Sequence, residues 1–139
     1  MTWSLKLNSL LPLPMNSNFA NPAAQTWPWP DSLDALIAAP DHHTLLFEND
    51  RVRLIQTRIL PGQIVPLHTH RWPAVLLMSS WSHFIRRDAA GNVVLDTRQS
   101  PEVPELNSPI SLDPLPPHSV ENVGDSVIDN LQLEIKNTR

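Results

Sequence analysis

The chain has 139 residues, of which 41% are hydrophobic and 17% charged, and this length and balance are typical of one globular domain. Its 15 prolines and 3 glycines disfavour long helices and favour short strands joined by fixed turns. The net charge of −4 argues against nucleic-acid binding, the absence of cysteine excludes disulfides and thiolate metal sites, and no apolar run reaches the ~18 residues of a membrane span.

Residues 1–30 are rich in proline, asparagine and serine, and they predict an irregular N-terminal arm in front of a single domain over residues 31–139. The apolar stretch of residues 10–14 is short and contains two prolines, which makes a poor export signal, so we expect a cytoplasmic protein. Met15 is an alternative start of the chain. Trp27 and Trp29 offer indole rings that can pin the arm to the domain or to a second subunit.

Residues 31–39 form the one segment with clear helical spacing. Asp31 or Ser32 can cap a helix there and Pro40 ends it, so we expect a short helix that covers one end of the domain. Its apolar stripe is expected to consist of Leu33, Leu36 and Ile37.

From residue 42 onward the pattern is that of short strands separated by turn signals such as Asn49-Asp50, Pro61-Gly62 and Gly124-Asp125. Arg53 and its neighbouring arginines in one such run are expected on a solvated face. In the last run, leucine and isoleucine alternate with Gln132 and Glu134. The sequence therefore predicts an all-β sandwich or barrel, with strands over residues 43–48, 52–60, 63–70, 74–79, 81–87, 93–97, 109–112, 118–123 and 127–136.

His68 and His70 are two residues apart in one of these strands, so their side chains share a face. Two imidazoles on one face of a strand are suited to hold one divalent metal. The alternative is that they are two ordinary polar residues facing a small cavity. His42 and His43 are adjacent and must point to opposite faces, so they cannot readily share a metal, and we expect a surface role for both.

Residues 62–70, GQIVPLHTH, resemble the first half of the first cupin motif, G-x5-H-x-H, and residues 118–122, HSVEN, are similar to the H-x3-N of the second motif. The resemblance covers residues 42–136. It implies a cupin-type double-stranded β-helix, or jelly roll, in which His68, His70 and His118 meet inside the barrel as metal ligands. The glutamate ligand of the family would fall at Ala74 or Val75, so the implied site has three histidines and no carboxylate, a variation seen among cupin-like thiol dioxygenases.

The resemblance implies a metal-binding cupin that acts on a small organic molecule, with a divalent transition metal as cofactor: iron, nickel, zinc or manganese. An enzyme of this kind would be dioxygenase-like, or isomerase- or lyase-like, and the sequence does not choose between them. A non-catalytic cupin that binds or senses a small molecule without metal is the alternative, and a barrel kept for assembly is a third hypothesis. The family also implies a homodimer.

Two further residues are candidates for the wall of the pocket. His83 lies in the predicted strand 81–87 and is either an acid or base of the site or a structural histidine. Trp72 directly follows the histidine pair and forms either an apolar wall of the site or part of the core.

Overall fold

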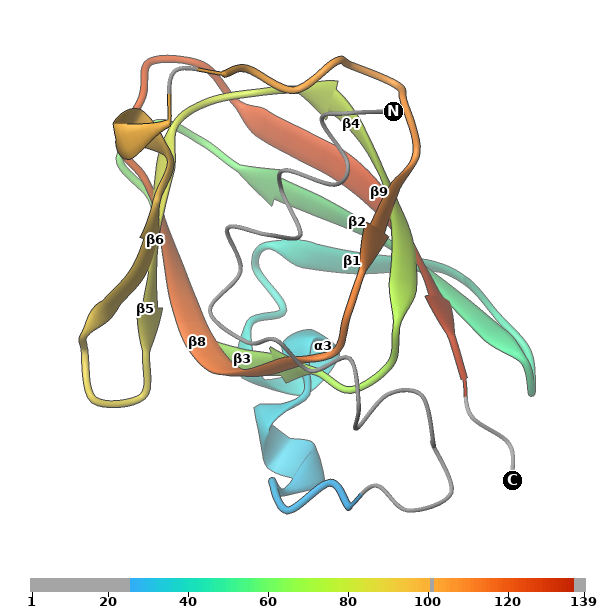
Figure 1. Ribbon diagram of the computed structural model, residues 1–139. Coiled ribbons are helices and arrows are strands. Elements are labelled where there is room, and N and C mark those ends of the chain that lie inside the picture. Colours follow the sequence, from blue (N-terminus) through green and yellow to red (C-terminus); the bar gives the residue numbers. More distant parts are fainter. Residues whose placement is uncertain (1–25, 101, 137–139) are drawn as a thin grey trace.

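The protein is a small β-barrel made of two antiparallel sheets, seen in a computed structural model that describes residues 26–100 and 102–136 (Figure 1). The larger sheet has the order β1-β2-β9-β4-β7 and the smaller one β3-β8-β5-β6. The strands are β1 His43–Glu48, β2 Val52–Ile59, β3 Ile64–His70, β4 Ala74–Ser80, β5 Phe84–Asp88, β6 Val93–Asp96, β7 Ile110–Leu112, β8 Leu115–Asn122 and β9 Ile128–Ile135. The predicted all-β fold class is confirmed.

The bounds of the strands agree with the prediction to within three residues. The largest differences are at the starts of β5 and β8. β8 begins ahead of Pro116 and Pro117, where the sequence predicts a loop, because its partner β3 is irregular opposite them and requires no regular ladder there. β5 begins later than predicted, at Phe84; ahead of it, the side chains of Ser82 and His83 bond to those of Asn122 and Thr97.

The predicted helix is shorter and is divided in two. A 3-10 turn, η2 (Asp31–Leu33), is followed by the four-residue helix α3 (Ala35–Ala38). Asp34 lies between them and caps α3, because its carboxylate accepts the backbone N–H of Leu36 at 3.1 Å, so the expected cap at residues 31 or 32 is wrong. The expected apolar stripe is wrong as well: Ile37 is 61% exposed, and the helix packs through Ala35 and Ala39 instead.

Of the predicted arm, only residues 26–30 are described; the remainder, including the possible start at Met15, lies outside the described residues. Trp27 and Trp29 pack edge to face against each other, with ring centroids 4.7 Å apart. No helix in the described part of the chain is long and apolar enough to cross a membrane.

Asn122, the last residue of the second motif, forms hydrogen bonds that join three segments of the barrel. Its side-chain amide donates to the carbonyl groups of Ile59 and Ser126, at 3.0 and 2.8 Å, and its Oδ1 accepts from Ser82 at 2.9 Å. Its backbone carbonyl accepts the N–H of Gly62, which has a φ of +82° in the turn between β2 and β3. The motif asparagine and the turn glycine are therefore structural partners.

Apolar packing surrounds a hollow interior. One buried cluster joins β4 and β7 through Leu76, Met78, Ile110 and Leu112. A second joins β2, β3 and β9 through Ile59, Val65 and Ile128, together with Ala39. Side chains from both clusters line the same cavity, which holds the polar residues described next.

Candidate metal centre

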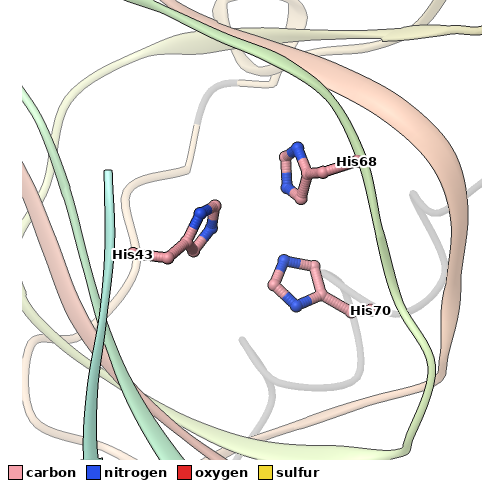
Figure 2. Close-up of side chains that lie close together, drawn as sticks. All are labelled: His43, His68 and His70. Atoms are coloured by element: carbon pink, nitrogen blue, oxygen red, sulfur yellow. The ribbon is translucent and has the colours of Figure 1, made fainter. Parts of the chain in front are cut away.

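Four buried histidines from three strands line one cavity. His43 belongs to β1, His68 and His70 to β3, and His118 to β8, and none of them is more than 5% exposed. Ligand nitrogens of His43, His68 and His70 all lie within 4.8 Å of one another, and Figure 2 shows the three rings facing a common space. The His118 ring lies against that of His68, with centroids 4.3 Å apart.

Prolines help to aim two of these histidines. His68 and His118 are cross-strand partners in β3 and β8, at a point where the register shifts on both sides. Each follows a proline by two residues, and each ring bonds through Nδ1 to that proline's carbonyl oxygen, Pro66 and Pro116, at 2.7 Å. Because proline has no N–H to donate, the ladder is interrupted there and the carbonyl groups are available to the imidazoles.

The other two histidines are held in the same way. His43 Nδ1 lies 2.9 Å from the carbonyl oxygen of Ala39, and His70 Nδ1 lies 3.0 Å from Oε2 of Glu134. Carbonyl and carboxylate oxygens can only accept, so the proton of each neutral imidazole is on Nδ1 and the lone pair is on Nε2. A histidine that donates its other nitrogen to an oxygen is the usual arrangement of a metal ligand. The donor set therefore fits a transition metal.

Burial keeps three of these histidines, His43, His68 and His118, uncharged. Burial, followed by the neighbouring His70, lowers the pKa of His43 to about 4, and the same causes lower the pKa of His68 to about 2. Burial, followed by His68, holds the pKa of His118 well below its ordinary value. These imidazoles are neutral at physiological pH, which is the form that binds metal.

Behind His70 lies a buried ion-pair network. Glu134 has no exposed surface, and its Oε1 accepts from Nε of Arg53 at 2.8 Å while Oε2 accepts from His70. Arg53 also donates to both oxygens of Asp34, at 2.9 and 3.1 Å. The expectation that Arg53 lies on a solvated face is wrong, because two carboxylates compensate the burial of its charge. Glu134 supports a histidine and does not replace the family's glutamate within the cluster.

The cavity has a volume of about 90 Å³. Its wall is largely apolar, with polar side chains at a few points, which is the usual character of a site for a small molecule. Besides the four histidines, the polar residues that line it are Thr57, Arg86, Asn130 and Gln132.

The structure brings His68, His70 and His118 to this cavity, as expected. The prediction of a surface role for His43 is wrong: adjacent residues do point to opposite faces, but His42 is the one that points outward, and His43 faces His68 and His70. Neither Trp72 nor His83 is among the described residues that line the cavity. Trp72 lies over the Arg53 guanidinium, 5.0 Å from ring centroid to Cζ, and His83 bonds to the Thr97 hydroxyl at 3.0 Å. A role for either in the site stays a prediction.

Sequence reasoning missed His43, Glu134 and Arg86. The alternation around Gln132 and Glu134 was a usable signal, because it marks two polar residues on one face of a strand. His43 carried no such signal, since it is 25 residues from His68 and its strand pairs with β2 and not with β3.

No protein-family model matches the chain, and no curated protein matches it either. Among solved structures, it is similar to a cupin domain from Bordetella pertussis Tohama I, at 20% identity over 68% of this chain and 92% of that one, with a TM-score of 0.55. A protein with a double-stranded β-helix domain from Klebsiella pneumoniae matches at 13% identity over 69% of this chain and 72% of that one, with a TM-score of 0.49.

An RmlC-like cupin from Desulfovibrio desulfuricans matches at 13% identity over 78% of this chain and 97% of that one, with a TM-score of 0.43. At these identities the likeness shows the fold alone. The two antiparallel sheets, the motif residues and the Bordetella pertussis domain agree on one architecture. The chain has the cupin fold, the double-stranded β-helix.

Proposed function

We propose that this chain is a metal-binding cupin that holds a divalent transition metal on its cavity histidines and acts on a small organic molecule beside it. One observation carries the proposal. Each of the four buried histidines uses Nδ1 to bond an oxygen, which leaves its Nε2 lone pair for a metal.

The proposed ligands are His43, His68 and His70, together with His118, which the motif resemblance adds. His43 comes from a strand outside the two cupin motifs, and it supplies a donor where the glutamate of the first motif is replaced by Ala74 or Val75. Imidazole donors favour zinc, iron or nickel over manganese, which prefers oxygen ligands. When bound, such a metal supplies a Lewis acid that polarises a substrate oxygen or lowers the pKa of a water molecule.

The chain's own residues contribute orientation and a dry environment. The oxygen partners fix each imidazole in one tautomer, and the apolar walls from the two core clusters keep bulk water from the histidines. These features serve a dioxygenase-like reaction and an isomerase- or lyase-like reaction equally.

Metal analysis of single histidine variants tests the proposal. Wild-type protein is stripped with a chelator, reloaded with Zn²⁺ or Co²⁺, and is expected to retain about one equivalent of metal per chain. His43→Ala, His68→Ala and His70→Ala should each lose most of that binding. His42→Ala is the matched control, because His42 is the neighbour of His43 on the opposite face, with its Nδ1 3.2 Å from the carbonyl oxygen of Arg58.

His118→Ala decides between three and four ligands. A loss of affinity of roughly 10-fold or more would assign His118 to the ligand set, and an unchanged affinity would remove it. The proposal fails if the reloaded wild type holds no metal, or if His43→Ala holds as much as His42→Ala.

A cupin that binds or senses a small molecule without metal is the second candidate. The absent motif glutamate and the apolar walls favour it. Chelator-treated protein would then be stabilised against heat by a small organic ligand and not by metal ions, whereas stabilisation by metal alone would contradict it.

We also propose that a second copy of the chain is a partner, as the family resemblance implies. The outward face of the larger sheet carries apolar side chains of β1 and β9, including Phe47 at 53% exposed, Leu131 and Ile135. Light scattering should give a dimer for the wild type and a monomer for Leu131→Glu, and a monomeric wild type would refute this. The cytoplasmic location stays a prediction.

A further inference from the structure

Arg86 is a buried cation in the wall of the cavity. It lies on β5 opposite Val120 of β8, is 8% exposed, and lines the cavity together with the four histidines. Its Nε and Nη1 are buried and have no hydrogen-bond partner among the described residues. The ring of Phe84 lies beside it, with its centroid 5.8 Å from the guanidinium carbon.

Arg86 lacks the carboxylate partner that the arginines of the described ion pairs have. Arg53, which is equally buried, bonds to two carboxylates, and Arg87, the next residue along β5, bonds to Glu121 at 2.9 Å. A buried guanidinium normally keeps such partners, because its charge is costly to remove from water. Burial lowers the pKa of Arg86 to about 10, so at neutral pH it stays charged. Two buried donors of a charged side chain in the cavity wall are therefore unused within the described part of the chain.

None of the described residues that line the cavity carries a carboxylate. The ionisable side chains that line it are the four histidines and Arg86 itself. Asp88, two residues further along β5, borders a second hollow together with Arg86, but its carboxylate accepts the backbone N–H groups of Ala90 and Asn92 in the adjacent turn.

We infer that Arg86 is the anion-binding residue of this cavity and that the natural ligand is a small organic acid, whose carboxylate pairs with the guanidinium while its other end faces the histidines. This inference rests on the proposed function, since it names the ligand class of the same site. A guanidinium presents paired N–H donors that match the two oxygens of a carboxylate.

The size and lining of the cavity limit the acid. A water-sized group needs ~10–15 Å³ of such volume, so the 90 Å³ cavity admits on the order of six to nine non-hydrogen atoms. Ile59, Met78 and Phe84 supply apolar wall for the body of the ligand. Asn130 also lines the cavity, and its Oδ1 is a further buried polar atom without a hydrogen-bond partner among the described residues.

The test compares small acids with neutral molecules of the same shape. Acetate, propanoate and butanoate, with acetamide, propanamide and butanamide as controls, are titrated calorimetrically into full-length protein, both metal-loaded and chelator-stripped. The acids should bind and the amides should not. Arg86→Met should weaken acid binding roughly 10- to 100-fold, because it removes the charge-assisted hydrogen bonds and keeps an unbranched apolar stem. Arg86→Lys, which keeps the charge but loses the paired donors, should fall between.

Arg87→Met is the matched control, because Arg87 is the adjacent arginine and its partner Glu121 lies outside the cavity. It should bind acids as the wild type does, and both methionine variants should keep the wild-type circular dichroism and metal content. Acids that bind Arg86→Met as tightly as wild type, or amides that bind as tightly as acids, would overturn the inference. If stripped protein binds acids through Arg86 but no metal binds, the metal proposal fails and this one stands. If metal binds and no acid does, this inference fails and the metal proposal stands.

Discussion

Glu134 should control the metal affinity of a site that it does not itself join. It is fully buried and accepts from Arg53 through one oxygen and from His70 through the other. In Glu134→Gln the side chain keeps its shape but has only one oxygen. Because Arg53 can only donate, that oxygen must face Arg53, and the amide N–H must face Nδ1 of His70. Nδ1 then becomes an acceptor, and its proton moves to Nε2, the nitrogen needed for the metal.

The loss of such a supporting partner typically costs 10- to 100-fold in metal affinity, or about 1.4–2.7 kcal/mol. The fold should survive. Arg53 keeps both of its bonds to Asp34, so the expected loss of folding stability is about 2 kcal/mol, below the 3–5 kcal/mol of a buried charge left without any partner.

Competition between the metal-free protein and a chromophoric chelator for Zn²⁺ measures the affinity. Asp34→Asn is the control, since it removes the other carboxylate on Arg53 and can still cap α3, and since Asp34 forms no hydrogen bond to His70 among the described residues. It should lose stability and keep the wild-type metal affinity. The reasoning is refuted if Glu134→Gln binds zinc within twofold of wild type, or if Asp34→Asn loses as much affinity.

Three further outcomes follow from burial and packing. Metal-free protein should lose stability as the pH falls, because histidines of the unfolded chain take up protons below a pKa of 6.5, while His43 and His68 of the folded protein stay neutral down to a pKa of about 4 and about 2. Between pH 7 and 5 each of these two histidines should lower the free energy of unfolding by about 2 kcal/mol. The midpoint of urea unfolding should fall accordingly, and a midpoint independent of pH would contradict this. Gly124→Ala should cost about 1–3 kcal/mol in urea unfolding, because its Cβ would overlap the Ser82 hydroxyl. Arg86→Met should raise the unliganded melting temperature by several degrees, and a lower value would indicate a partner for the charge.

The strand pattern could be predicted because the turn residues that separate the strands are recognised from a few neighbouring positions. Gly62 has a positive φ of +82° in the turn that Pro61-Gly62 predicts. The HxH pair was equally local, since alternation in one strand puts His68 and His70 on one face without any knowledge of the fold. These features depend on a few consecutive residues, which is why one sequence is enough.

What could not be predicted is which face of each strand points inward. On β9, Gln132 and Glu134 face the interior while Leu131 and Ile135 are exposed, the opposite of the usual order. Alternation shows that two sets of side chains lie on opposite faces of a strand, but not which face points inward. The apolar set is assigned to the interior by default, and this assignment is wrong in a barrel with a polar interior. His43 was missed for a related reason, because only closure of the barrel brings β1 to face β3.

The two buried arginines show why pairing, and not burial, separates structure from function. Arg53 and Arg86 are buried to the same degree, both on inward faces, and in sequence both read as basic strand residues. Arg53 has two carboxylate partners, Asp34 at the N-terminus of α3 and Glu134 in β9, so its charge is neutralised within the fold. Arg86 has none among the described residues of the cavity that it lines, and we infer that a bound anion offsets the electrostatic cost of its burial. A charge that a fold buries without a partner thus specifies the sign of the ligand, which the histidine cluster alone does not.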